Sequence, residues 1–254
     1  TLYKHQLGLK RQRFRARSIT LENAFSRSIN PYFGKLGITY LARDEFGEMA
    51  HELFFNEPLE FDLPLRRSSC FVPESDFERA ELASGFNTRT TISPLHAALI
   101  AALPVNGGKM MRPYVVKRIE NESGNDIYCG ESEVLAAPLS SYSITQLARL
   151  MQATVKKGTA RKSFRHLRRY RDYSNWVLGG KTGAINMTEE QRRCEWYAGF
   201  AAKGDTRLSV AMVMVHGELR TVKPSYVAAE LIKKCFTRKS VRTVSANKKK
   251  ASSG

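Results

Sequence analysis

The sequence has few cysteines and no long hydrophobic run, and each absence excludes a class of protein. The four cysteines are widely spaced and form no Cys-x-x-Cys pair; they are Cys70, Cys129, Cys194 and Cys235. This spacing indicates neither a zinc site nor a disulfide scaffold. The longest apolar stretch, residues 97–105, is far shorter than the roughly 20 residues of a membrane-spanning helix. No secretory signal pattern opens the chain, so we expect any export signal to lie outside it.

Acidic residues are scarce in three basic segments, which account for the formal net charge of +17. Residues 1–17, 156–172 and 233–250 hold 22 of the 41 Lys and Arg but 1 of the 24 Asp and Glu. Such segments can bind a nucleic acid, an anionic membrane or a wall polymer, and they are equally typical of solvated tails and a basic loop. No aromatic-rich RNA-binding signature or helix-turn-helix pattern accompanies the charge, which disfavours a nucleic-acid partner.

The apolar pattern predicts helices in the first part of the chain and a sheet near its end. Capping residues and helical spacing predict helices that begin near residues 18–20, 93 and 143, and a terminal helix over 226–236. Residues 56–87 contain three prolines and no regular periodicity, so we expect a long irregular connection there.

Three consecutive antiparallel strands are predicted over residues 176–215, with a turn at 203–205. A shorter strand pair is predicted around a turn at 123–125. Helices followed by an antiparallel sheet, with a final helix packed on that sheet, indicate an α+β fold in which helical layers flank the sheet.

The first predicted strand ends in two glycines and the triplet Lys181-Thr182-Gly183. Glycines let a ligand or another backbone approach a strand closely. A lone Lys-Thr-Gly is also typical of a plain strand end, so its meaning depends on the other motifs of the chain.

Three motifs in this order resemble those of the penicillin-binding protein transpeptidase domain, a member of the serine D,D-peptidase and β-lactamase-like superfamily. The motifs are Ser28-Ile29-Asn30, Gly158-Thr159-Ala160 and Lys181-Thr182-Gly183. Supporting stretches are residues 91–95, 106–109, 112–113 and 194–200. The resemblance covers most of residues 18–235. It implies a domain over 18–238, between a basic edge at 1–17 and a basic disordered tail at 239–254.

The resemblance also implies three catalytic residues. Ser28 would take part in proton transfer to the leaving group, and Asn30 would hydrogen-bond the amide of the substrate. Lys181 would set the local potential and help to hold Ser28. Without the resemblance, serine and asparagine at a helix end are usually caps. No metal and no cofactor are implied.

The candidate substrate-binding residues are Thr182, Gly183 and Ala184. By resemblance, Thr182 would bind the carboxylate of the substrate, and the backbone N–H of Ala184 would donate to the oxyanion. Most of these transpeptidases carry a hydroxyl residue at the position of Ala184. The alanine removes one donor to the substrate carboxylate, so we expect weaker or differently arranged binding.

A second departure concerns the nucleophile, which the family places in a Ser-x-x-Lys motif several dozen residues before Ser28. The sole Ser-x-x-Lys of this chain is Ser245-Ala246-Asn247-Lys248, in the basic tail. We therefore expect a transpeptidase domain whose N-terminal part, with the nucleophile, is missing from this chain. A truncated product and a pseudoenzyme would both explain this.

The resulting hypothesis is a peptidoglycan D,D-transpeptidase that forms a serine acyl-enzyme with D-Ala-D-Ala stem peptides and is acylated by β-lactams. It would stand on the periplasmic or extracytoplasmic face of the bacterial inner membrane, with its anchor outside this chain and with possible wall-synthesis or membrane partners. The alternative is a noncatalytic binding or scaffold protein of the same fold, which holds an anionic partner through its basic segments. A nucleic-acid-binding domain would rest on charge alone.

Overall fold

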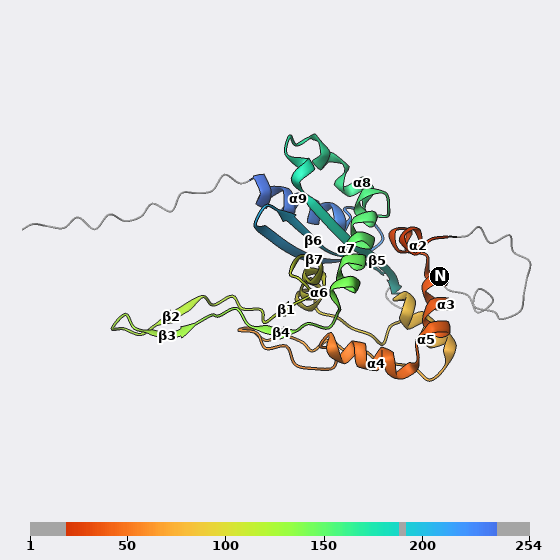
Figure 1. Cartoon of the computed structure of the whole chain (residues 1–254), viewed down its shortest axis with the longest axis horizontal. Helices are drawn as coiled ribbons and strands as arrows, with labels where there is room; N and C mark the ends of the chain where they lie inside the picture. Colours follow the sequence, from red (N-terminus) through yellow and green to blue (C-terminus); the bar gives the residue numbers. More distant parts are fainter. Residues whose placement is uncertain (1–18, 188–191, 238–254) are drawn as a thin grey trace, which may run out of the picture.

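The computed structural model describes residues 19–187 and 192–237 (Figure 1). The expected basic edge at residues 1–17 and the expected tail at 239–254 lie outside the described residues. The described part combines helices with an antiparallel sheet, and the α+β prediction is thereby confirmed. No described helix is both long and apolar enough to cross a bilayer.

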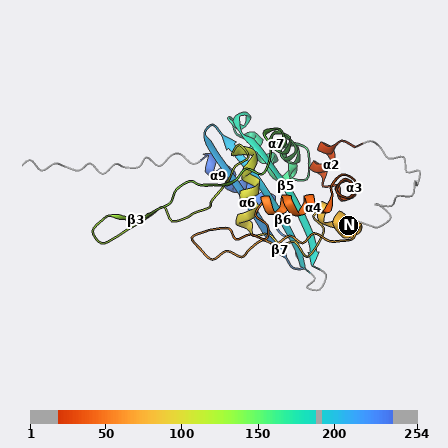
Figure 2. The same ribbon diagram turned by 60° about the horizontal axis from the view of Figure 1, so that its bottom comes forward.

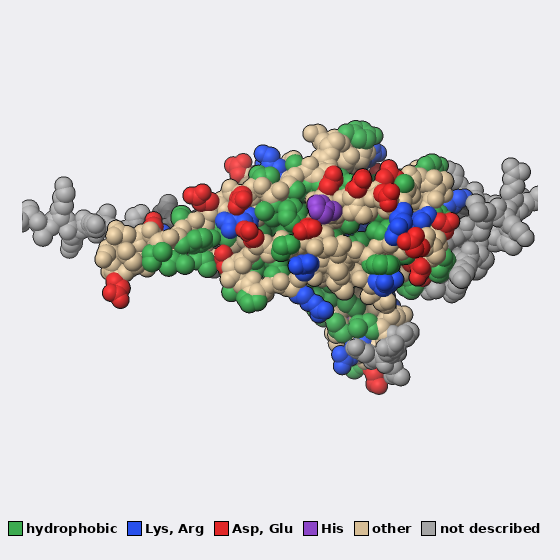
Figure 3. All heavy atoms as spheres, turned by 90° about the horizontal axis from the view of Figure 1, so that it is seen from below, with side chains coloured by type: hydrophobic (Ala, Val, Ile, Leu, Met, Phe, Trp, Pro, Cys, Tyr) green, Lys and Arg blue, Asp and Glu red, His purple; other side chains and the backbone are tan. Residues whose placement is uncertain are grey.

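The first described elements are α2 (Leu21–Arg27), α3 (Asn30–Tyr40) and α4 (Arg43–Glu52). The Thr20 hydroxyl caps α2 by accepting a hydrogen bond from the Asn23 backbone N–H at 3.3 Å. Pro31 lies in the first turn of α3, where a missing N–H costs nothing. The face that carries α4 mixes acidic and basic side chains (Figure 3), so positive charge does not gather there.

The prediction of an irregular connection over residues 56–87 is wrong for its second half, where α5 (Asp76–Ser84) forms. The Ser75 hydroxyl accepts a hydrogen bond from the Glu78 backbone N–H, and Gly85 ends the helix with φ 71°. These end signals are local, but the nine-residue helix has too few apolar positions to show a period. It packs against α3, where a Cβ on Gly37 would lie 2.5 Å from the Ala83 Cβ.

The middle of the chain forms helical elements and a projecting arm. The helical elements are α6 (Pro94–Ala102), η1 (Leu103–Val105) and α7 (Ser141–Lys156). The strand pairs are β1 (Met110–Met111) with β4 (Val134–Ala136), and β2 (Arg118–Glu120) with β3 (Asp126–Cys129). Both ribbon views show the β2–β3 hairpin extending away from the body (Figures 1 and 2).

The predicted three-stranded sheet forms from β5 (Val177–Met187), β6 (Arg192–Lys203) and β7 (Thr206–His216). Its order is β5-β6-β7, all antiparallel, so β5 is an edge strand of this sheet. Thr182 lies opposite Tyr197, and Ala184 lies opposite Glu195. The Lys-Thr-Gly triplet therefore lies on an edge that a ligand can approach.

Helices cover both faces of this sheet. The bounds of the remaining elements are α8 (Arg161–Phe164), η2 (Arg165–Arg169), η3 (Tyr173–Asn175) and α9 (Pro224–Thr237). One face packs against α8 and α9 in a core that includes Phe164, Tyr197 and Ile232. The other face packs against α6 and α7 through Phe200 and Met151. The sheet is thus a rigid support for the residues along the β5 edge.

Candidate active site

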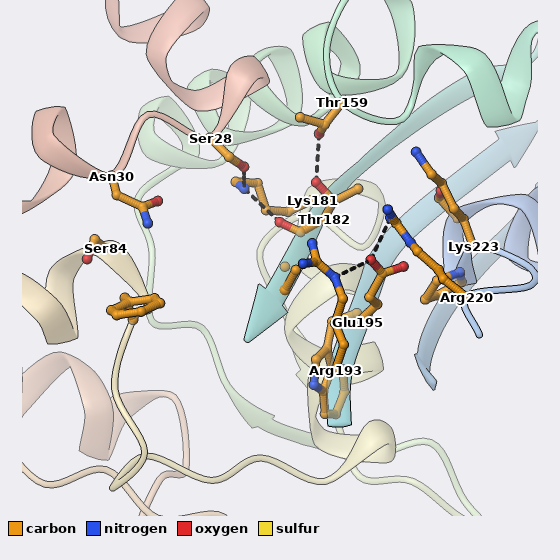
Figure 4. A pocket seen from close by; sticks show the side chains of 17 residues that line it. Ser28, Asn30, Ser84, Thr159, Lys181, Thr182, Arg193, Glu195, Arg220 and Lys223 are labelled. Atoms are coloured by element: carbon orange, nitrogen blue, oxygen red, sulfur yellow. Dashed lines mark hydrogen bonds and ion pairs between the residues drawn. The ribbon is translucent and has the colours of Figure 1, made fainter. Parts of the chain in front are cut away.

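A cavity of about 420 Å³ lies along the β5 edge (Figure 4). Its walls come from the α2–α3 junction, the end of α5, the segment after α7, strands β5 and β6, and the connection between β7 and α9. All six candidate residues line it: Ser28, Asn30, Lys181, Thr182, Gly183 and Ala184. The fold thus brings together two motifs that are separated by about 150 residues in the sequence.

Ser28 ends α2 in a strained backbone conformation. Its φ of 53° and ψ of 58° lie in the left-handed region, which serine rarely adopts. The conformation is held by the Ser28 backbone N–H, which donates to carbonyl oxygens of α2. It presents the hydroxyl to the cavity, where Oγ accepts a hydrogen bond from Lys181 Nζ.

Lys181 reaches Ser28 from the edge strand, and its side chain is largely buried. Its Nζ also donates to the Thr182 carbonyl oxygen at 2.8 Å and lies 5.6 Å from the centre of the Phe25 ring. Burial lowers the pKa of Lys181 from 10.5 to about 8, because desolvation disfavours the charged ammonium. The pKa therefore lies much closer to neutral pH than that of a solvated lysine, although the ammonium form still predominates at pH 7.

Thr182 is held by a hydrogen bond with the hydroxyl of Thr159. Its Oγ1 lies 2.6 Å from the Oγ1 of Thr159, which follows the end of α7. The Thr159 backbone N–H donates to the Ser26 carbonyl oxygen at 3.0 Å, and a Cβ on Gly158 would lie 2.2 Å from the same oxygen. Glycine is required there, since only a residue without a side chain lets this turn contact α2 so closely. The motif contained Thr159, but its contact with Thr182 could not be predicted.

Asn30 and Ser84 lie on the wall that faces Lys181 (Figure 4). Asn30 is the first residue of α3, and Ser84 is the last residue of α5. Residues 84–86 have no predicted role, because the pattern of the chain does not predict the helix that ends there. Its capping residues Ser75 and Gly85 were the signal that could have revealed it.

The remaining wall carries charged residues that were not predicted: Arg193, Glu195, Arg220 and Lys223. Glu195 is 4% exposed, and its Oε1 lies 2.8 Å from Arg193 Nε and 2.5 Å from an Arg220 guanidinium nitrogen. Burial raises the pKa of Glu195, but the hydrogen bonds from Arg193 and Arg220 outweigh it and lower the pKa overall. A glutamate within the otherwise apolar run 194–202 of β6 was the available signal for this cluster.

The site combines a hydrogen-bonded pair, Ser28 and Lys181, with hydroxyl and cationic groups that suit an anionic ligand. Within residues 19–187 and 192–237, no group of three or more His, Cys, Asp or Glu side chains could hold a metal ion.

The family model described as "Penicillin binding protein transpeptidase domain" matches residues 4–237. The chain belongs to this family. This transpeptidase domain is 25% identical over 208 residues to the peptidoglycan D,D-transpeptidase PbpA of Mycolicibacterium smegmatis. That alignment covers 79% of the chain and 39% of the relative, so the domain matches less than half of the relative's length.

Solved structures of the family share the fold of this transpeptidase domain. The D,D-transpeptidase domain of a peptidoglycan glycosyltransferase from Eggerthella lenta aligns with a TM-score of 0.73 and 22% identity, over 87% of this chain and 54% of that one. The imipenem acyl-enzyme complex of penicillin-binding protein A from M. tuberculosis gives a TM-score of 0.72 and 22% identity, over 86% and 48%. This chain spans about half of each of these two structures.

Proposed function

We propose that this chain is the C-terminal part of the catalytic domain of a peptidoglycan D,D-transpeptidase. The nucleophilic serine would belong to a Ser-x-x-Lys segment outside this chain. The observation that carries the proposal is the hydrogen bond from Lys181 to Ser28, in the same cavity as the Thr159–Thr182 contact. A strained serine and a buried lysine that meet across 153 positions are typical of a reaction site.

The reaction would proceed by two acyl transfers. The nucleophilic serine attacks the carbonyl of the penultimate D-alanine and forms an ester, and the bond to the terminal D-alanine breaks. The proton that this serine loses passes through Ser28 to the leaving amine, and Lys181 holds Ser28 and supplies positive potential. An amine of a second stem peptide then attacks the ester and forms the cross-linking amide, and the proton that this amine loses returns to the released serine.

The substrate would lie along β5 with its terminal carboxylate near Thr182. The Ala184 backbone N–H would donate to the carbonyl oxygen as negative charge develops there. A β-lactam would occupy the same position and acylate the same serine. Penicillin-binding protein A from M. tuberculosis, which has a similar fold, is described in acyl-enzyme complexes with imipenem and ceftriaxone. The protein would act at the outer face of the cytoplasmic membrane, with stem peptides as substrates.

The test uses the longest protein that contains this chain, treated with a labelled penicillin. We expect a stoichiometric adduct on a serine outside residues 1–254. Ser28→Ala and Lys181→Ala should each slow its formation by about 10²-fold or more, because each removes a member of the proton-transfer pair. Peptide mapping locates the adduct, and labelling time courses give the rates.

Ser174→Ala and Lys162→Ala are matched controls, since both residues are exposed and neither lines the cavity. The controls should be acylated at the parental rate. Mapping of the adduct to any of residues 1–254, or the absence of any adduct, would contradict the proposal. A protein that binds the penicillin without acylation would favour the noncatalytic scaffold.

A further inference from the structure

We propose that Arg193, Arg220 and Lys223 form a second anion subsite in the cavity, which takes a carboxylate of the bound peptide. The proposal rests on the proposed function, because it assumes a peptide that lies along β5. The C-terminus of the peptide is placed near Thr182, so the carboxylate taken here belongs to a side chain further from the scissile bond.

The first reason is the charge of the cavity wall. Among the described lining residues, four are basic and only Glu195 is acidic. Lys181 lies at the Ser28 end, and the other three cations lie beyond Thr182 on β6 and on the connection between β7 and α9 (Figure 4). A concave surface with an excess of one sign concentrates its field, so this part of the cavity attracts an anion.

The second reason is the way in which Glu195 holds the two arginines. It contacts Arg193 through Nε and Arg220 through one terminal nitrogen, and Arg193 Nη1 also donates to Asn186 Oδ1 at 3.2 Å. Each guanidinium has five N–H donors in a rigid plane. The side chains of Arg193 and Arg220 remain 41% and 46% exposed, so donors are left over on the cavity side. Glu195 therefore fixes two cations but neutralises only one unit of their charge.

The third reason is the start of α9. This 14-residue helix begins at Pro224, and Pro224 and Ser225 line the cavity directly after Lys223. The N-terminus of a helix carries partial positive charge, which adds to the charge of Lys223. No ion pair to Lys223 occurs among the described residues.

The fourth reason is the register of the sheet. Ala184 lies directly opposite Glu195, and its small side chain leaves this stretch of the edge without a hydroxyl donor. Opposite residues of an antiparallel pair share a face, so the arginines that Glu195 holds lie on the face where the donor is missing. Arg193, Arg220 and Lys223 thus supply anion-binding groups where β5 does not. Glu195 is a positioning residue in this arrangement.

The test measures binding of three N-acetylated tripeptides to the full chain by tryptophan fluorescence, to which Trp196 in the cavity wall contributes. One tripeptide is glutamyl-D-alanyl-D-alanine, the second carries glutamine in place of glutamate, and the third has a C-terminal amide. We expect the glutamine analogue to bind about tenfold more weakly than the first peptide, because a charge-assisted hydrogen bond is lost. The C-terminal amide tests the contact of the terminal carboxylate near Thr182 separately.

The double variant Arg220→Gln/Lys223→Gln should reduce this preference to about twofold or less, as in a double-mutant cycle. The matched control Arg207→Gln/Lys234→Gln removes the same charge from exposed positions that do not line the cavity, and it should keep the preference.

Glu195→Gln removes a negative charge, so simple electrostatics predicts tighter binding of the glutamate peptide. A positioning role predicts the reverse, a smaller preference at an unchanged unfolding midpoint.

Equal affinity of the parent for the glutamate and glutamine peptides would overturn the subsite alone, and so would an equal loss in the control variant. A parent that binds none of the peptides would contradict the proposed function and the subsite together. The two failures are therefore distinguishable.

Discussion

At the residue scale, the pKa of Lys181 depends on the burial of its side chain. Its side chain belongs to a motif that the sequence displays, but its lowered pKa depends on desolvation by neighbours such as Phe25. A lysine that stayed in water would keep a pKa near 10.4 and would be a simple cation at neutral pH. Burial alone makes this lysine a candidate for proton transfer.

We expect Lys181 to make the free energy of unfolding depend on pH. Its ordinary pKa of 10.5 falls to about 8 in the fold, so between these values the unfolded chain binds more protons and stability rises with pH. The Lys181→Met variant lacks this group. The unfolding free energy of the parent should therefore rise relative to that of the variant by up to about 3 kcal/mol from pH 7 to pH 10. Chemical denaturation at several pH values measures the difference.

Lys162→Met is the control for this experiment, because Lys162 is exposed. Its difference from the parent should stay constant over the same range. Parallel profiles for Lys181→Met and the parent would show that Lys181 is not desolvated.

At the element scale, the turn after α7 joins two parts of the site. Gly158 lets this turn touch the end of α2, and the same turn places Thr159 against Thr182. The packing of one glycine therefore affects both the strained Ser28 junction and the edge strand.

Gly158→Ala should destabilise the domain by about 1–3 kcal/mol, because its Cβ would press on a backbone oxygen that cannot easily move. Gly47→Ala is the opposite case, since no atom lies within 4 Å of a Cβ there and α4 is helical. It should stabilise by roughly 0.5–1 kcal/mol. Denaturant titrations compare the two, and an equal effect of both changes would contradict this account of Gly158.

At the scale of the whole molecule, stability and site geometry come from the sheet and its helices rather than from the β2–β3 arm. The sheet is covered on both faces, and the helices and the connection that line the cavity contact it or one another. The arm projects into solvent, with Ile119 48% and Ile127 67% exposed.

Replacing residues 120–127 with a two-residue Asn-Gly turn should therefore change the unfolding free energy by less than about 0.5 kcal/mol. The turn would connect Ile119 to Tyr128, which are already paired across the hairpin, and would keep Tyr128, whose hydroxyl is buried. Differential scanning calorimetry measures the effect. A drop of several degrees in the midpoint would show that the arm supports the body.

The sequence by itself determined the features that depend on local interactions. The three strands of the sheet follow from apolar runs and turn residues, α6 follows from its cap Ser93 and its apolar positions, and α7 follows from its apolar positions. The motif residues at the site were also visible, because each motif is a short run along the chain. Helix α5 was missed although its caps were present, since so short a helix gives no clear period.

Only the tertiary structure decided which of these residues meet. Lys181 and Ser28 form a pair because α2 and β5 pack on the same helix, α7, and that contact is independent of their local sequences. The cluster of Arg193, Glu195 and Arg220 arises in the same way, from the register of β6 and from the path of the chain between β7 and α9. Burial, pKa and the convergence of charges depend on distances between segments remote in sequence, and a linear pattern does not contain those distances.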